Sequence, residues 1–571
     1  MSVFSLPFLH GALAAVLPKL AAWRRDFHAH PEAGWTEFRT AALIIRRLRE
    51  LGYAIRMGEA ACASDRRMGV PSSAVLAAAR ERALEHGADA ELVTGMGDGY
   101  TGFWADLDCG PGPVTAFRFD MDCNEVAECA EESHRPVREG FASRWPGLMH
   151  ACGHDGHAAV GLGLAEVLVS IRRHLRGRIR LIFQPAEEGA RGALPMSEAG
   201  AVDGVDVLFG FHIGFKAEGP GSLICGTQGF LATTKRDVLF SGVPAHAGAA
   251  PEEGKDALLA ACSAVVNLHA ISRNGKGGTR IAVGRLEGGE ARNVIPASAR
   301  LFMETRGETT ELDAYMTAES ERILRASADL WGCACEWRTV GNSAGGGSSP
   351  ELARLIATVA EAMGGWKTVI PMSGFGATED FACLMSRVQA SGGLASYLQV
   401  GTDRAAGHHS DRFDFDETCL GRALELLARL AVRMAGGGQE DTETETESDM
   451  EFLDEVVRRK GIHVQLWLEG EDGEGFGRGR VELLQLVDEL GSLSKAAKQL
   501  GMSYRGAWGK IKKAERIAGE TLVDASGTKR DGYSLTPAGR ELVQRFQQWY
   551  ADVESFAKKR AEALFSDFDK E

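Results

Sequence analysis

The sequence has no run of about 18 uncharged apolar residues, the length that a membrane-spanning helix needs. Its apolar N-terminal stretch, Phe4 to Trp23, lacks a basic segment in front of it, and Arg24 and Arg25 come after it instead. That order is the reverse of a secretion signal. We therefore expect neither a membrane span nor a signal peptide.

A disulfide framework is also missing, because the 11 cysteines are odd in number and scattered. This usage is typical of a reducing compartment, so we expect a cytoplasmic protein. The formal net charge of −15 argues against the whole chain wrapping nucleic acid or lying on an anionic membrane. A basic module within an acidic chain is still compatible with that average.

The composition of the 571 residues, 44% hydrophobic and 25% charged, is that of a globular protein with sizeable cores. The length predicts three or four domains. Short apolar runs such as Val114 to Asp122, Ile179 to Phe183 and Val207 to His212 alternate with helical segments such as Gly153 to Leu175. This alternation predicts an α/β domain with a mostly parallel sheet and helices on both faces.

From about Thr227 the pattern changes to strand, helix, strand, strand, helix, which predicts an inserted α+β domain. The α/β pattern then resumes up to about Met434. Seven of the thirteen residues from Gln439 to Glu451 are acidic, which predicts a solvated linker. The predicted organisation is a catalytic domain in two parts, 1–226 and 340–435, the inserted domain 227–339, a linker 436–452 and a C-terminal domain 453–571.

Three segments carry residue types that suit a metal site. The first, HACGHDGH (150–157), combines Cys and His ligands for transition metals with glycines that let the backbone turn around an ion. The second, QPAEEG (184–189), follows a strand, so one of its two carboxylates can bind metal while the other faces a substrate. The third is GHHS (407–410), and His212 adds a further ligand type at the end of an apolar strand.

Ligands at the carboxyl ends of several strands of one sheet converge in α/β folds. Two ions roughly 3.5–4 Å apart would lower the pKa of a shared water toward about 7 and polarise a carbonyl group. The remaining carboxylate would take the proton of that water and pass it to a leaving amine. A lone buried His is more often structural, and a lone Glu pair is more often a solvated helix face, but the three segments together favour a metal site.

Five motifs resemble those of the aminoacylase and carboxypeptidase-type metalloamidohydrolases: HACGHDGH, FQPAEEG, SGVPAHAGAAPEEGKDALLAA, RNVIPA and GHHSDRFDF. The resemblance covers about residues 10 to 435. Within that family, WRRDFHAHPEAGWTEFRT, RMGVP, SHRPVREGFAS and FLATTK resemble the branch of p-aminobenzoyl-glutamate hydrolase A subunits. The resemblance implies cleavage of the amide bond of p-aminobenzoyl-glutamate or a related N-acyl amino acid.

The resemblance also implies roles for individual residues. It implies two Mn or Zn ions on five ligands, of which His409 is chosen over His408 because the His-Ser pair matches the family's ligand position. The ligands are Cys152, His154, Glu188, His212 and His409. Glu187 would be the general acid/base, and Asp120, Asp122 and Asp155 would orient the ligands.

The inserted domain would be a lid that forms a dimer. His246 would stabilise the oxyanion, in its own chain or in that of a partner, and Asn293 and Arg306 would hold the substrate carboxylate. The family's usual GSED-type string reads GATED here (376–380), a mild change near the site. The resemblance leaves open a homodimer or a complex with a second, homologous subunit.

The C-terminal segment Gly491 to Glu515 has the layout of a helix-turn-helix, with Leu493, Ala497 and Leu500 on the inner face of its first helix. The second helix would pack Ala507 and Ile511 inward. A wing hairpin would follow around 527–532. Residues expected to face DNA are Ser503, Arg505, Lys510, Lys512, Lys513, Lys529 and Arg530.

Between Arg480 and Arg540 there are 11 Lys and Arg against 7 Asp and Glu, a net charge of +4 in an acidic chain. The segment 453–560 resembles the winged helix-turn-helix domain of molybdate-responsive transcription regulators. Their molybdate-binding domain has no counterpart here, so molybdate sensing is not expected. A structural or protein-binding winged helix is the alternative to DNA binding.

Three hypotheses for the whole chain follow. The first is an amidohydrolase that acts on a small N-acyl amino acid. The second is a transcription regulator in which the hydrolase-like body senses a ligand. The third is a catalytically inactive scaffold. The full ligand set and Glu187 favour the first over the third.

Overall fold

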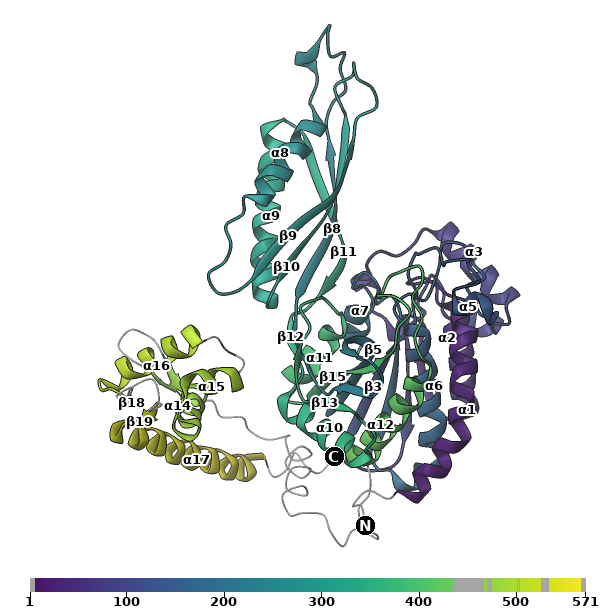
Figure 1. The fold of residues 1–571 in the computed structure, drawn as a ribbon. Helices are drawn as coiled ribbons and strands as arrows, with labels where there is room; N and C mark the ends of the chain where they lie inside the picture. Colours follow the sequence, from purple (N-terminus) through teal and green to yellow (C-terminus); the bar gives the residue numbers. More distant parts are fainter. Residues whose placement is uncertain are drawn as a thin grey trace. The chain divides into compact units, whose positions relative to one another are not determined.

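A computed structural model describes residues 6–435, 467–469, 475–500, 502, 504–524 and 533–565. The chain forms two compact units, Met1–Val457 and Arg458–Glu571, each of which is described by itself. Figure 1 shows the elements of both. Within the described ranges, no helix combines the length and the apolar character needed to cross a bilayer.

The larger unit is built on an eight-stranded sheet with the order β1-β2-β4-β3-β5-β15-β6-β13. Its four central strands, β4, β3, β5 and β15, are parallel to one another, whereas β1, β2 and β6 pair antiparallel with their neighbours toward the centre. The predicted α/β fold class is confirmed, with a sheet that is mixed toward its edges. The strands are β1 (Ala54–Met57), β2 (Phe103–Asp108), β3 (Val114–Asp120), β4 (Arg178–Gln184), β5 (Val207–Glu218), β6 (Ser222–Ile224), β13 (Thr368–Ile370) and β15 (Leu394–Thr402).

Helices cover both faces of this sheet. One face packs against α1, α2, α6, α10 and α12, and the other against α7 and α11. Helix α6 is buried from His154 to Leu168 because it lies between the sheet and α1 (Figure 1). The helices are α1 (Pro7–Ala29), α2 (Phe38–Glu50), α3 (Ser73–Glu85), α4 (Ala90–Gly95), α5 (Arg135–Arg138), α6 (His154–Ser170), α7 (Ala193–Glu198), α10 (Pro350–Met363), α11 (Phe381–Ala390) and α12 (Thr418–Ala435).

Glycines let α6 approach both of its neighbours. A methyl group added at Gly161 would lie 2.7 Å from the ring of Phe119 on β3. One added at Gly163 would lie 2.8 Å from Leu20 on α1. This tight packing fixes the N-terminus of α6, where His154 is the first helical residue.

The inserted layer is an antiparallel sheet with the order β11-β8-β10-β9, covered by α8 and α9. The sequence-based prediction placed the boundary of this layer at 339, within β11, but was wrong in giving no strand after the second helix. That strand is an edge strand whose apolar alternation is short: Cys335 and Trp337 pack against the core, and a bulge between Thr339 and Gly341 then shifts the register. The elements are β8 (Ala232–Ser241), α8 (Ala257–His269), β9 (Thr279–Gly288), β10 (Ser298–Gly307), α9 (Thr310–Leu330) and β11 (Ala334–Ser343). A small sheet is formed by strands that precede and follow this insertion in the sequence: β7 (Thr227–Phe230), β12 (Gly346–Gly347) and β14 (Ser373–Gly374).

The smaller unit has the helices and the short hairpin of a winged helix-turn-helix. Leu493, Ala497, Ala507 and Ile511 are buried in its core as predicted, and Leu500 is half-buried against it. The elements are β16 (Trp467–Glu469), β17 (Gly475–Gly477), α14 (Arg478–Leu490), α15 (Leu493–Gln499), α16 (Tyr504–Ala518), β18 (Val523–Asp524), β19 (Ser534–Leu535) and α17 (Pro537–Phe565).

Candidate metal centre and nucleic-acid interface

The side chains predicted to bind metal or to transfer a proton gather at the carboxyl ends of three of the four central parallel strands. Glu187 and Glu188 follow β4, His212 lies on β5 and His409 follows β15. Cys152 and His154 join them from the N-terminus of α6. Ligands of α/β proteins are expected at this edge, because the chain leaves each parallel strand there.

Cys152, His154 and His212 form the first group, with their ligand atoms within 4.8 Å of one another. The Sγ of Cys152 lies 3.4 Å from Nε2 of His212. Each histidine places Nδ1 2.8 Å from a main-chain carbonyl, that of Asp122 for His154 and that of Ile213 for His212. Because a carbonyl only accepts, Nδ1 carries the proton and Nε2 is left with a lone pair for a metal.

Cys152, Glu188 and His409 form a second group within the same 4.8 Å limit, and His154, Glu187 and Glu188 form a third. The five predicted ligands therefore lie in three overlapping groups, each pair of which shares one residue: Cys152, His154 or Glu188. His408, the alternative to His409, is directed elsewhere. Its Nε2 donates to the carbonyl of Ile213 at 3.1 Å, and its Nδ1 accepts from Arg404 at 2.8 Å.

The donor set suits divalent metal ions. Nε2 of His154 is buried without a hydrogen-bond partner among the described residues, which a cation would compensate, and Oε1 of Glu188 has its contact with His409, 3.3 Å away. Burial, followed by the charge of Glu188, raises the pKa of the Cys152 thiol well above its usual value. Burial also lowers the pKa of His212 well below its usual value, which keeps the imidazole neutral. Thiolate, imidazole and carboxylate together are ligands of Zn²⁺ and of similar ions.

Asp122 orients the two adjacent glutamates. Its carboxylate accepts the backbone N–H of Glu187 at 3.0 Å and that of Glu188 at 2.9 Å. Burial and the nearby charge of Glu379 raise the pKa of Glu187 well above its usual value. Although burial opposes it, the contact with His409 lowers the pKa of Glu188 to about 2. The pair therefore divides into one protonatable group and one carboxylate that stays ionised, as acid/base catalysis beside a ligand requires.

Left-handed backbone is concentrated around this centre. In the described part of the chain, the non-glycine residues with positive φ are Trp35, Ala186, Ala190, Phe215 and His409. Ala186 and Ala190 flank the glutamate pair, and His409 is itself in this conformation, with φ 66°. Such backbone costs on the order of 1–3 kcal/mol per residue and is typical of functional sites.

A buried charge network that the sequence-based prediction missed supports the centre from inside the sheet. Arg118 of β3 contacts Asp120, and it donates to Glu379 at 3.0 Å and to Asp380 at 3.2 Å. Asp120 in turn lies 2.5 Å from Nδ1 of His157. The signal was an arginine inside the apolar run VTAFRFD, which a buried strand accommodates only with partners.

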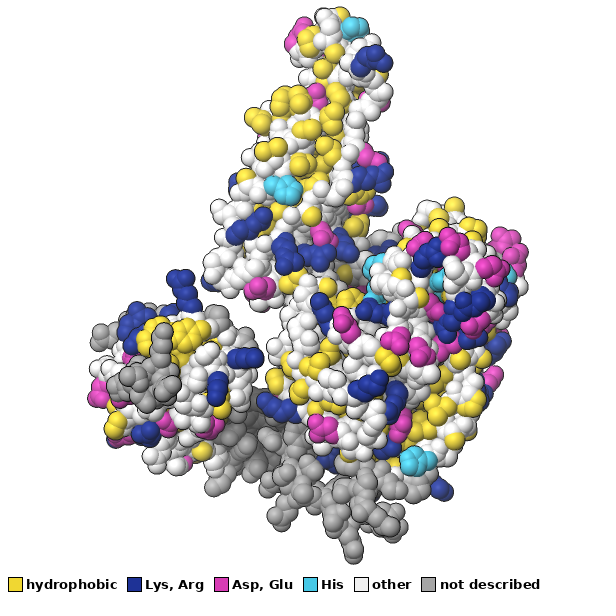
Figure 2. Space-filling model, in the orientation of Figure 1, with side chains coloured by type: hydrophobic (Ala, Val, Ile, Leu, Met, Phe, Trp, Pro, Cys, Tyr) yellow, Lys and Arg dark blue, Asp and Glu magenta, His cyan; other side chains and the backbone are white. Residues whose placement is uncertain are grey.

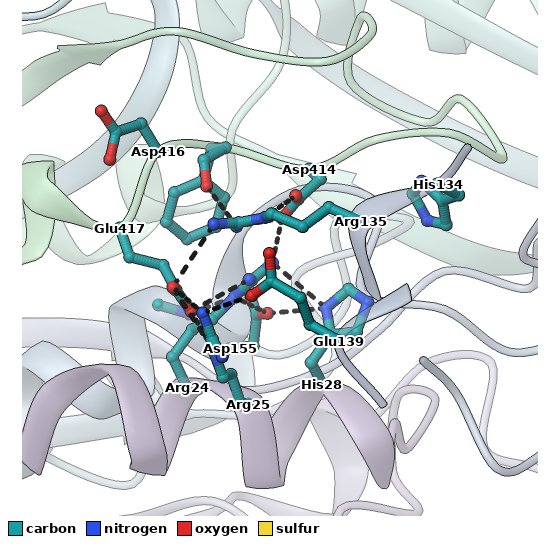
Figure 3. A network of polar contacts seen from close by, with 12 residues as sticks. Arg24, Arg25, His28, His134, Arg135, Glu139, Asp155, Asp414, Asp416 and Glu417 are labelled. Carbon is teal, nitrogen blue, oxygen red and sulfur yellow. Dashed lines mark hydrogen bonds and ion pairs between the residues drawn. The ribbon is translucent and has the colours of Figure 1, made fainter. Parts of the chain in front are cut away.

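Asp155 corrects one of the predictions. Its carboxylate turns away from the ligand groups and accepts from Nε of Arg24 at 2.8 Å, with Nδ1 of His28 also at 2.8 Å. Figure 3 shows it in a buried network with Asp414 and Glu417. Successive residues in the first turn of α6 point in different directions, so His154 faces the metal centre and Asp155 faces α1.

The residues predicted to act from the lid, which is the inserted layer of β8 to β11, do not all reach the metal centre of their own chain. His246 is exposed and comes five residues after β8, which is ten residues long and spans roughly 30 Å. It pairs with Val294, beyond the end of β8 that is opposite to β7. Asn293 lies beside it, accepting from the N–H of Ala247 at 3.1 Å. Arg306 lies at the opposite end of β10, paired with Thr233, so one chain cannot bring Asn293 and Arg306 to a single ligand.

In the smaller unit, the expected DNA-facing residues lie on α16 where they can be described. Arg505, Lys510 and Lys512 are exposed and Lys513 is half-buried. Lys512 also donates to Glu515 at 2.7 Å. Ser503, Lys529 and Arg530 lie outside the described residues.

Comparisons with known proteins found one family for each unit. The family described as peptidase family M20/M25/M40 matches residues 116–433, and the family of bacterial regulatory helix-turn-helix proteins of the lysR type matches residues 479–540. The chain is 44% identical to indole-3-acetyl-aspartic acid hydrolase of Enterobacter agglomerans, over 75% of this chain and 98% of that protein. It is 45% identical to the A subunit of p-aminobenzoyl-glutamate hydrolase of Escherichia coli, over 73% of this chain and 96% of that protein.

Two solved structures are similar over the same region. One is an aminobenzoyl-glutamate utilization protein of Klebsiella pneumoniae, with 38% identity and a TM-score of 0.64, covering 75% of this chain and 98% of that one. The other is a Bacillus subtilis protein described as a dinuclear metal-binding peptidase of the M20 family. It has 25% identity and a TM-score of 0.51, covering 73% of this chain and 98% of that one.

Proposed function

Because this chain belongs to the M20/M25/M40 peptidase family, whose matched relatives include amidohydrolases, we propose that it cleaves the amide bond of p-aminobenzoyl-glutamate or a related N-acyl amino acid. The observation that carries the proposal is the overlap of the groups formed by Cys152, His154, Glu188, His212 and His409, with Glu187 beside them. The two relatives are named for conjugates of aspartate and of glutamate. We accordingly take an acidic amino acid as the part released.

The proposed cofactor is a pair of divalent ions, Mn or Zn. Cys152, His154 and His212 would hold one, and Cys152, Glu188 and His409 would hold the other. When bound, such ions polarise the amide carbonyl and lower the pKa of a nearby water. The buried Nε2 of His154, which has no hydrogen-bond partner among the described residues, supports this assignment.

Glu187 is the proposed general acid/base. Its carboxylate lies 4.0 Å from Nε2 of His154, and Asp122 fixes its backbone. It would accept a proton from the attacking water and deliver it to the nitrogen of the leaving amino acid. The raised pKa of Glu187, caused by burial and by Glu379, suits a group that must hold that proton between the two steps.

The lid is proposed to act in a dimer. His246 and Asn293 lie too far along the lid to serve their own centre, so they would reach the centre of a partner chain, where His246 would stabilise the oxyanion. Arg306, at the near end of β10, would hold the substrate carboxylate in its own chain. Figure 2 shows hydrophobic side chains gathered over α8, where Leu259 is 42% and Val266 71% exposed. The partner is a second copy or a homologous chain, the latter because the Escherichia coli relative is named as one of the subunits of its enzyme.

The second proposed function is DNA binding by the smaller unit, supported by the basic exposed face of α16. The chain would then be an enzyme joined to a DNA-binding unit. The alternative is a regulator whose hydrolase-like body senses a ligand. Turnover of a conjugate by the purified chain distinguishes the enzyme from the sensor, because only the enzyme releases an amino acid.

The deciding experiment combines metal analysis with hydrolysis assays on p-aminobenzoyl and acyl conjugates of several amino acids. We expect close to two divalent ions per chain and metal-dependent release of the amino acid. A metal-loaded protein that hydrolyses none of the conjugates would reject the enzyme in favour of the sensor.

A further inference from the structure

A guanidinium group without a carboxylate partner lies beside the glutamate pair. Nε of Arg191 donates to the carbonyl of Glu188 at 3.0 Å, and Nη1 donates to that of Gly69 at 3.2 Å. Both acceptors are neutral, and Arg191 forms no ion pair within the described part of the chain. A half-buried cation usually has a counter-charge, so this one is available to an anionic ligand.

The space for this side chain is built by glycines from three segments. A methyl group added at Gly34 would lie 2.7 Å from Nη2 of Arg191, one at Gly69 would lie 2.8 Å from Cδ, and one at Gly189 would lie 3.0 Å from Nε. Segments distant in sequence thus leave room for one guanidinium and hold it against the backbone of Glu188. The packing of these segments therefore fixes the position of the Arg191 guanidinium. Groups that bind ligands are held in this way, whereas solvated surface arginines are not.

A second cation lies next to the same turn. Lys235 of β8 pairs in register with Gly341 of β11. A methyl group added at Gly341 would lie 3.2 Å from Cδ of Lys235 and 2.2 Å from the carbonyl oxygen of Gly189. The lysine stem therefore passes close to the turn that carries Arg191. Within the described residues, the Lys235 ammonium also has no ion pair or hydrogen bond.

Lys235 also lies near the metal centre, because the Gly189 carbonyl that its stem approaches belongs to the residue directly after the predicted ligand Glu188. Two positive charges without an ion pair among the described residues thus lie near Glu188. Two motifs that the proposed chemistry leaves unused contribute to this pair, because Lys235 ends FLATTK and Gly69, whose carbonyl accepts from Arg191, lies in RMGVP.

We propose that Arg191 and Lys235 form the subsite for the side-chain carboxylate of the released amino acid. This inference rests on the proposed amidohydrolase function and gives its specificity: conjugates of dicarboxylic amino acids are selected over conjugates of neutral ones. Arg191 supplies a planar fork that matches a carboxylate, and Lys235 supplies a second point charge. Arg306 is then left for the α-carboxylate.

The test measures binding, so that it does not depend on turnover. Metal-loaded Glu187→Gln protein is titrated calorimetrically with N-(4-aminobenzoyl)-glutamate and with N-(4-aminobenzoyl)-glutamine, which differ in one charge. We expect about 10- to 100-fold tighter binding of the glutamate conjugate, the range for hydrogen bonds to a charged group. Adding Arg191→Gln should remove most of that preference, and Lys235→Gln should remove part of it, with little change for the glutamine conjugate.

Arg46→Gln, at an exposed arginine of α2, is the matched control and should keep the full preference. Arg191→Lys retains the charge without the fork and should keep part of the preference, which serves if Arg191→Gln does not fold. A preference that is absent from the parent protein, or that persists in Arg191→Gln, would overturn the proposal. A preference kept in full by Lys235→Gln would overturn the role of Lys235.

Hydrolysis by the chain with Glu187 intact is measured separately. Discrimination without hydrolysis would sink the proposed function and leave the carboxylate subsite standing. Hydrolysis without discrimination would support the proposed function and overturn the carboxylate subsite.

Discussion

The main-chain carbonyl of Asp122 lies 2.8 Å from Nδ1 of His154 and fixes the orientation of that imidazole. The side chain of the same aspartate accepts the two backbone N–H groups of Glu187 and Glu188. Asp122, two positions after the end of β3, thus aligns a histidine from α6 with two glutamates that follow β4. The predicted centre is assembled by the junction of three elements.

The first prediction concerns this junction. Asp122→Asn replaces one acceptor oxygen by an amide that cannot accept from a backbone N–H, so the glutamate turn should loosen. We expect metal affinity to fall by about 10- to 100-fold, the usual cost of removing a group that orients a ligand. Competition with a metal-chelating dye measures the metal affinity of the variant and of the parent protein. Asp329→Asn, on the exposed end of α9, is the control, and equal affinities in both variants would refute the role of Asp122.

The second prediction separates the two glutamates. Glu187→Gln should lower kcat by on the order of 10²–10⁴-fold, because the proton acceptor is lost. Its metal content should stay that of the parent protein. Glu188→Gln should instead lose metal, since a neutral amide replaces an anionic ligand. Unchanged turnover in Glu187→Gln would remove that residue from its assigned role.

The third prediction uses the network around Arg24 (Figure 3). Although burial opposes ionisation, hydrogen bonds from Arg135 and Arg24 hold the pKa of Asp414 below its usual value. A carboxylate with a lowered folded-state pKa stabilises the fold at pH above its unfolded value near 4 and loses that contribution as the pH falls. Asp414→Asn should therefore cost about 3 kcal/mol at pH 7, the lower end for breaking a buried pair.

Thermal unfolding at several pH values checks this. The Tm of Asp414→Asn should lie several degrees below that of the parent at pH 7, and the gap should narrow below about pH 4. A gap that does not change with pH would assign the loss to packing rather than to charge.

The fourth prediction concerns α16. If its exposed face binds DNA phosphates, Arg505→Ala should weaken binding of the full chain to duplex DNA. It should also reduce the slope of log K against log salt by about 1. Electrophoretic mobility shifts at several salt concentrations measure both quantities. Arg545→Ala on α17 should change neither, because that arginine is already paired with Glu541. Binding that does not depend on salt would favour a structural or protein-binding role for this unit.

Much of the larger unit could be predicted from local patterns. Alternating strands and helices indicate the α/β class, because apolar period and turn residues are encoded within each element. The motifs around Cys152, Glu187 and His409 indicate metal chemistry, because their residue types have few other uses at such spacing. The edge strand β11 was missed because its apolar alternation is limited to Cys335 and Trp337.

Only the tertiary structure decided which way each side chain turns. Asp155 and His154 are neighbours in the sequence, yet one faces α1 and the other faces the metal centre. Asn293 and Arg306 are thirteen positions apart in the sequence, but the extended strand β10 holds them at opposite ends of the lid. Arg191 lies in no motif quoted for the branch, and Lys235 ends FLATTK without a role of its own there, so only the folding of distant segments around them shows two cations without an ion pair among the described residues. The amino-acid sequence determined the chemistry that is available, and the packing of distant elements determined which groups share a site, because direction and distance are properties of the whole fold.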